Sequence, residues 1–82
     1  MRMPRSLSGD AFARLLRPYG YEVTRQTSSH LRLTSTSRGS QHHITIPAHH
    51  ELKVGTLHGI LTDVAAYLEM DRVELVIALF GR

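Results

Sequence analysis

The sequence predicts a single α+β domain, residues 1–82, in which a three-stranded antiparallel sheet is covered on one face by helices, with an extra helix at the C-terminal end. Two observations lead to this prediction. Apolar residues recur with a helical period near both ends of the chain and with an alternating, strand-like period in three segments between them. A chain of 82 residues, 41% of them apolar, has enough apolar residues for one small core and is too short for two.

The first helix is predicted to begin after Ser8, because serine is a good N-cap and Asp10 places a carboxylate in the first turn. Its apolar residues share one helical face: Phe12, Leu15, Leu16 and Tyr19. Pro18 and Gly20 are expected to end it. Residues 1–7, which contain two arginines and a proline, are predicted to form a loose arm.

Three strands are predicted next, joined by turns, the second of which is a Ser/Gly-rich segment over residues 35–41. Each has alternating apolar residues, which are Tyr21 and Val23, Leu31 and Leu33, and Ile44 and Ile46. Strands with one apolar face form an antiparallel sheet that helices cover on that side. Since neighbouring side chains point to opposite faces, four polar residues are expected on the uncovered face: His30, Arg32, His43 and Thr45.

Two more helices are predicted after a loop from Pro47 to Val54. The first is expected to open at Gly55 and Thr56, with Thr56 as its N-cap. Its apolar face comprises Leu57, Ile60, Leu61, Val64, Ala65 and Leu68. The second covers residues 71–81, because Asp71 and Glu74 have the spacing of a capping box and Gly81 follows the last apolar residue.

The last helix is apolar on more than one side. Val73, Val76, Ile77 and Phe80 share one face, whereas Leu75 and Leu79 fall elsewhere. One small core can use only one side of a helix, so the sequence predicts a partner surface or a homodimer contact over Val73–Phe80. Glutamate at positions 75 and 79 is therefore expected to spare the fold.

Composition narrows the function classes. The absence of cysteine excludes disulfides, thiolate nucleophiles and cysteine zinc sites. With no signal-peptide pattern at its start, the chain is expected in the cytoplasm, and its longest apolar run, Val73–Phe80, is too short to cross a membrane. The net charge of +3 is uneven: eight Arg and Lys stand against three Asp and Glu through His58, and two against four afterwards. A basic portion suggests a polyanion as ligand, although ordinary charge scatter gives the same count.

The six histidines suggest a metal site, but their spacing argues against one. His42–His43 and His49–His50 are adjacent pairs, and neighbouring residues of a strand point to opposite faces, so His42 and His43 cannot ligate one metal ion together. The sequence also lacks an H-E-x-x-H motif. No metal or other cofactor is expected.

Four motifs, in order along the chain, resemble one family. They are Leu15-Leu16 with Tyr19-Gly20-Tyr21, Arg25 with Ser28-Ser29-His30, Ile44-Thr45-Ile46-Pro47 with His49, and Leu52-Lys53-Val54-Gly55-Thr56-Leu57 with Ile60-Leu61. Together they resemble the HicA (YcfA-like) mRNA-interferase toxins, over residues 8–61. The resemblance implies an α-β-β-β-α fold like that of the double-stranded-RNA-binding domain. Ser28 stands where the family has glycine.

The resemblance implies an endoribonuclease toxin of a type II toxin–antitoxin system, which cleaves mRNA under stress, needs no metal and has a HicB-like antitoxin as partner. It implies His30 as the catalytic residue. This is chemically reasonable, because RNA supplies its own nucleophile, the 2′-OH, and an imidazole ordinarily exchanges protons near neutral pH. The candidate RNA-binding residues are Arg25, Ser29, Arg32, His43, His49, Lys53 and Thr56. Among them, His43 is expected beside His30, and Lys53 and Thr56 at a helix start, where backbone N–H groups favour a phosphate.

Two alternatives stay open at this point. The first is a non-catalytic RNA-binding domain of the same fold, which the replacement of glycine by Ser28 favours. The second is a small interaction module that docks a protein through Val73–Phe80. Growth arrest that depends on His30 indicates the enzyme, RNA binding without cleavage indicates the first alternative, and neither property indicates the second.

Overall fold

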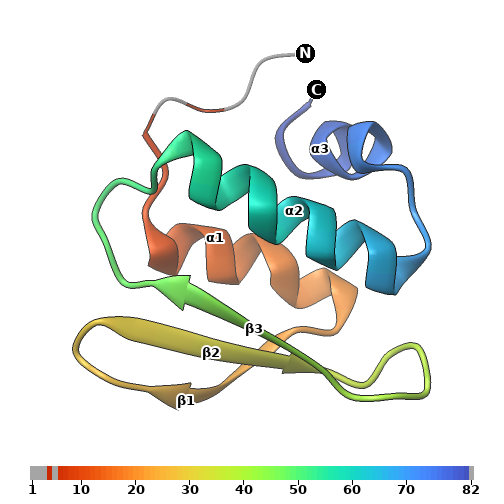
Figure 1. Ribbon diagram of the computed structural model, residues 1–82, viewed down its shortest axis with the longest axis horizontal. Helices are drawn as coiled ribbons and strands as arrows, with labels where there is room; N and C mark the ends of the chain where they lie inside the picture. The colour runs from red at the N-terminus through yellow and green to blue at the C-terminus, as the bar shows by residue number, and fades with distance from the viewer. Residues whose placement is uncertain (1–3, 5, 82) are drawn as a thin grey trace.

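The computed structural model, which describes Pro4 and residues 6–81, has the predicted order of elements. These are α1 (Gly9–Leu16), η1 (Arg17–Tyr19), β1 (Glu22–Gln26), β2 (His30–Ser35), β3 (His42–Pro47), α2 (Val54–Leu68) and α3 (Arg72–Phe80). Helices α1 and α2 lie side by side over one face of the sheet, and α3 packs against α2 (Figure 1). The predicted fold class is confirmed. No helix in the described part of the chain is long and apolar enough to span a membrane.

Helix α1 begins and ends for the predicted reasons. The Ser8 hydroxyl accepts a hydrogen bond from the Ala11 N–H at 3.1 Å, and Phe12 and Leu16 are completely buried. The helix tightens into the single turn η1, which contains Pro18 and is closed by Gly20 with a φ of 92°. A side chain at Gly20 would be strained by this φ and would also meet the Ser35 hydroxyl at 2.9 Å.

The sheet has the order β1-β2-β3, and both pairs are antiparallel. Leu31 pairs with Ile46 and Leu33 with Ile44, and all four side chains are buried under the helices. Tyr21 enters the core just before β1 begins, whereas Val23, on the edge strand, is 47% exposed. The core therefore forms between the sheet and helices α1 and α2, and the opposite face of the sheet is left uncovered (Figure 1).

The predicted N-cap of α2 lies three residues too late in the chain. Lys53, not Thr56, is the N-cap, and its side chain makes no capping hydrogen bond. Leu52 is buried, and its N–H donates to the Leu7 carbonyl at 2.8 Å. This anchor fixes the chain directly before the helix, so α2 begins without a side-chain cap. Thr56 lies within the first turn.

The predicted loose arm is corrected at its last residue, because Leu7 packs against the core as well as accepting the bond from Leu52. Residues 1–3 and 5 of that arm lie outside the described residues.

Helix α3 has the predicted capping box of Asp71 and Glu74, and Gly81 is its C-cap. The prediction of which side it buries is wrong. Leu75 is completely buried and Leu79 packs against the core, whereas Val73 and Ile77 are 58% and 49% exposed. The sequence pattern alone does not show on which side of α3 the core lies, and contact with α2 selects the side of Leu75.

Two apolar residues of α3, Leu75 and Ile77, differ in burial and should therefore differ in their contribution to stability. Leu75→Ala should lower the free energy of unfolding by about 2–5 kcal/mol, because it leaves a cavity in the core. Ile77→Ala, the matched control two residues away, should change it by less than about 1 kcal/mol. Urea denaturation followed by circular dichroism measures both values. Equal losses in the two variants would contradict the assigned core face.

Candidate functional site

The uncovered face of the sheet, called the open face below, carries the predicted polar side chains. The burial of β2 alternates, with His30 and Arg32 exposed and Leu31 and Leu33 buried. In β3, His43 and Thr45 are exposed, whereas Ile44 and Ile46 are buried. The prediction that these four residues share the face opposite the core is confirmed.

His30 is the first residue of β2 and follows directly on the turn from β1. Its Nδ1 is hydrogen-bonded to the Ser29 hydroxyl at 2.9 Å. The turn itself is well held, because the Thr27 hydroxyl accepts the N–H groups of Ser29 at 3.3 Å and of His30 at 3.1 Å. The Ala48 N–H also donates to the Ser29 carbonyl at 2.8 Å. The imidazole is thus fixed through Nδ1, and Nε2 makes no hydrogen bond to the described residues.

Ser28 occupies this turn without backbone strain. Among the described residues other than glycine, Glu69 alone has a positive φ. Serine at position 28 is therefore compatible with the turn that presents His30, and this position does not need glycine for its conformation.

Arg25 reaches the open face through a β-bulge. Val23 pairs with Leu33, but Arg25 pairs with Arg32, so β1 advances two residues where β2 advances one. Strict alternation from Val23 would have placed Arg25 on the covered face, opposite Leu31. The bulge turns Arg25 to the open face, which agrees with the general role of bulges in redirecting side chains at functional sites.

Arg25 and Arg32 therefore lie directly opposite each other on neighbouring strands, and neither forms an ion pair with a described carboxylate. Glu22 is the only carboxylate in the three strands. Like charges directly opposite each other destabilise a sheet unless an anion lies between them. This pair, called the arginine pair below, lies two residues from His30 along β2 and places two positive charges on the open face.

Three other predicted residues lie around the same end of the molecule, where the β1–β2 turn, the exit of β3 and the starts of α1 and α2 meet (Figure 1). The Gly9 N–H donates to the His49 carbonyl at 3.0 Å, which ties the His49 backbone to α1. Lys53 is exposed as the N-cap of α2, and Thr56 is half-buried in its first turn. His49, Lys53 and Thr56, called the rim residues below, thus lie in the loop after β3 and at the start of α2, and they do not project from the sheet.

The expectation that His43 lies beside His30 is wrong. His30 pairs with Pro47, whereas His43 pairs with Thr34, so the two histidines are separated by four residues along β2 and β3. At about 3.3 Å per residue they are about 13 Å apart. Both histidines lie on the open face, but they are too far apart to contact each other. No group of three or more metal-ligating side chains gathers in the part of the chain that the structure describes.

His42 points to the covered face, as predicted, and joins a cluster that the sequence did not reveal. Its Nδ1 is 2.6 Å from the Tyr21 hydroxyl and its Nε2 is 3.1 Å from Asp63. The ring of Tyr67 stacks on it with centroids 4.7 Å apart. Burial, with the nearby Tyr67 and Asp63 as weaker causes, raises the pKa of Tyr21 well above its usual value. This cluster fastens β3 to α2 at the end of the sheet away from His30.

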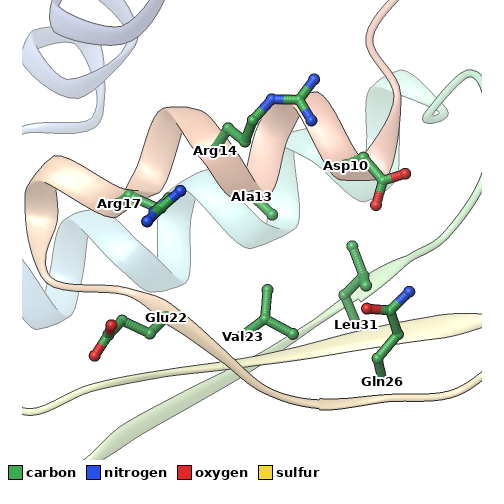
Figure 2. A pocket seen from close by; sticks show the side chains of 8 residues that line it. All are labelled: Asp10, Ala13, Arg14, Arg17, Glu22, Val23, Gln26 and Leu31. Carbon is green, nitrogen blue, oxygen red and sulfur yellow. The ribbon is translucent and has the colours of Figure 1, made fainter.

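A groove of about 330 Å³ lies elsewhere, between α1 and the edge strand β1. Figure 2 shows Val23 and Leu31 pointing from the sheet toward α1, with Arg14 and Arg17 on the helix above them. Asp10 also lines it, and Glu22 lies at its edge with its side chain directed away from α1. The groove is on the covered side, so the sheet separates it from His30.

Comparison with known proteins agrees with the resemblance in the sequence. The family model described as the HicA toxin of bacterial toxin–antitoxin systems matches residues 9–65. That range contains α1, the whole sheet and most of α2. No curated protein and no solved structure matches the chain.

The arginine pair generates a prediction about stability. Arg25→Gln should keep the free energy of unfolding unchanged or raise it by up to about 1 kcal/mol at low salt, because it removes a repulsion between facing charges. The difference should shrink in high salt, where such charges are screened. Arg38→Gln is the matched control, since Arg38 has an ion pair with Glu69 at 3.2 Å. Urea denaturation at two salt concentrations tests this, and a clear loss of stability at low salt for Arg25→Gln would show that the two arginines do not repel each other.

Proposed function

Because the chain belongs to the HicA toxins of bacterial toxin–antitoxin systems, we propose that it is an endoribonuclease that cleaves mRNA with His30 as the proton-transfer residue. The observation that carries this proposal is the position of His30. Its imidazole stands on the open face, held through Nδ1 by Ser29, two residues from the arginine pair.

The proposed reaction uses the RNA's own 2′-OH as nucleophile. His30 Nε2 takes the 2′-OH proton as the oxygen attacks the neighbouring phosphorus, and the bond to the 5′-oxygen of the next nucleotide breaks. The leaving oxygen receives a proton from water or from the His30 imidazolium, so the products are a 2′,3′-cyclic phosphate and a 5′-hydroxyl end. Negative charge grows on the phosphate oxygens during this step, and Arg25 and Arg32 stabilise it.

Ser29 has a positioning role in this proposal. A histidine can transfer a proton through one ring nitrogen while the other is fixed by a hydrogen bond, and that bond selects the tautomer. The Ser29 hydroxyl occupies Nδ1 and so presents Nε2 to the substrate. The backbone bond from Ala48 to Ser29 gives this arrangement a rigid base.

The rim residues are proposed to hold RNA on either side of the cleaved bond. Lys53 supplies a positive charge beside the first backbone N–H groups of α2, which have no partners within a helix and attract phosphate. His49 and Thr56 lie near them in the chain and offer hydrogen bonds. RNA binding by these groups is expected to place the toxin on mRNA in the cytoplasm.

A HicB-like antitoxin is the proposed protein partner. An antitoxin that covers the open face would block His30 and neutralise the arginine pair with acidic side chains. The exposed Val73 and Ile77 on α3 offer a separate apolar contact, for the antitoxin or for a second copy of this chain. A protein-interaction module without RNA activity would use this helix alone.

The central test of the enzyme is His30→Ala. The side chain is exposed and packs against no core residue, so stability should change by less than about 1 kcal/mol. Cleavage of a labelled RNA should fall at least about a hundredfold, the usual contribution of a general acid–base group. RNA affinity should change little, and the activity of the unaltered chain should persist in EDTA. Equal rates for both chains would remove His30 as the catalyst, and binding without cleavage by either would favour the non-catalytic RNA-binding domain.

Ser29→Ala tests the positioning role, with Ser28→Ala as the matched control in the same turn. Ser29→Ala should lower the rate constant for cleavage about tenfold or more, because the His30 ring loses the hydrogen bond that orients it. RNA affinity should stay close to that of the unaltered chain, because the arginine pair is unchanged. Nitrogen NMR of the imidazole should show a shift in tautomer population for Ser29→Ala only, and Ser29→Thr should restore it. The idea fails if Ser28→Ala and Ser29→Ala give the same spectra and rates.

A further inference from the structure

A second set of polar groups crosses the open face beyond the arginine pair. The Thr24 and Thr34 hydroxyls are 2.8 Å apart, and the Thr34 hydroxyl is also 2.8 Å from His43 Nδ1. These three residues, one from each strand, form a continuous hydrogen-bonded line that is called the hydroxyl–imidazole row below. His43 is exposed, and its Nε2 has no hydrogen bond to a described residue.

The open face therefore has three parallel rows along β2. Each row crosses the sheet, and the rows follow one another along β2. The first contains His30, the second contains Arg25, Arg32 and Thr45, and the third is the hydroxyl–imidazole row. Neighbouring rows are two residues, or about 6.6 Å, apart. From the first row to the third is about 13 Å, the length of roughly four nucleotides in a stacked strand at about 3.4 Å each.

The chemistry of the third row differs from that of the second. It has no Arg or Lys, and Glu22 pairs with Thr34 beside it. A carboxylate at this position disfavours a phosphate, whereas hydroxyls and an imidazole suit neutral hydrogen-bonding groups. Such groups are the edges of bases and the 2′-OH of ribose, and the imidazole plane can also stack on a base.

We propose that the hydroxyl–imidazole row is a nucleoside subsite for unpaired RNA, with the strand running along β2 from His30 over the arginine pair to His43. This inference rests on the proposed ribonuclease function and specifies its substrate class. The cleaved phosphate lies between His30 and the arginine pair, and a base with its ribose lies at His43.

The same geometry disfavours a duplex on this face. Three β-strands about 4.8 Å apart make a surface only about 10 Å wide, and a single RNA strand can follow this surface lengthwise. In a duplex the base faces are stacked and the base edges are paired, so His43 would have neither to bind. A regular duplex also holds each 2′-OH out of line with the leaving 5′-oxygen, while attack at phosphorus requires the two oxygens in line. An unpaired segment satisfies the contacts at His30 and His43 together.

The test measures binding separately from cleavage, in a chain that carries His30→Ala. Three probes are used: a two-nucleotide RNA that reaches only the first two rows, a six-nucleotide unpaired RNA, and the same six-nucleotide sequence inside a hairpin stem. Adding His43→Ala should raise the dissociation constant for the unpaired six-nucleotide RNA at least about fivefold. This factor is the smallest effect expected when one stacked base loses its contact. Binding of the two-nucleotide RNA should not change.

His58→Ala is the matched control, because His58 lies on α2, on the covered side, and contacts Arg72. It should leave all three affinities unchanged. Thr34→Val, which breaks the row while keeping side-chain shape, should reproduce part of the effect of His43→Ala.

Two results would overturn the subsite. One is an equal effect of His43→Ala on the short and long unpaired RNAs, or no effect on either. The other is a hairpin stem that binds as tightly as the unpaired RNA and depends equally on His43. Because these measurements need no cleavage, a chain that binds as expected but never cleaves RNA would retain the subsite and lose the enzyme. A chain that cleaves RNA without dependence on His43 would retain the proposed enzyme and lose the subsite.

Discussion

The burial of Leu31 and Leu33 under α1 and α2 is the constraint on which the rest of the structure depends. A strand has a period of two, so once these side chains enter the core, His30 and Arg32 must project from the other face. A shift of one residue would expose the leucines and bury the imidazole and the guanidinium, at a large cost. The hydrophobic core thus fixes the orientation of the functional residues, although none of them belongs to it.

The bulge in β1 places a residue on the open face that simple alternation would place on the covered face. It brings Arg25 opposite Arg32 and leaves Thr24 bonded to Thr34, so β1 contributes to two neighbouring rows of the open face. The resulting charge repulsion opposes folding in the absence of an anion. A small domain can accommodate this because the core lies on the other side of the sheet, where the cluster of Tyr21, His42 and Asp63 also holds β3 to α2.

Local sequence rules predicted the elements well, because caps and periods are local properties. The Ser8 cap, the capping box of Asp71 and Glu74, and the outward direction of His30 follow from residues a few positions apart. The start of α2 could not be predicted in this way, since Leu52 is anchored by Leu7, which is distant in sequence. The same holds for α3, whose buried side depends on contact with α2.

The candidate site was predictable in composition but not in arrangement. Alternation placed His30 and His43 on one face, yet their separation depends on strand register, which pairs His43 with Thr34 and not with the start of β2. That register changes the chemistry that His43 can perform. Two histidines in contact could share one phosphate as acid and base, whereas at about 13 Å the proposed function assigns them to different nucleotides. In the proposed function His30 therefore transfers protons alone, and His43 selects the RNA that reaches the active site.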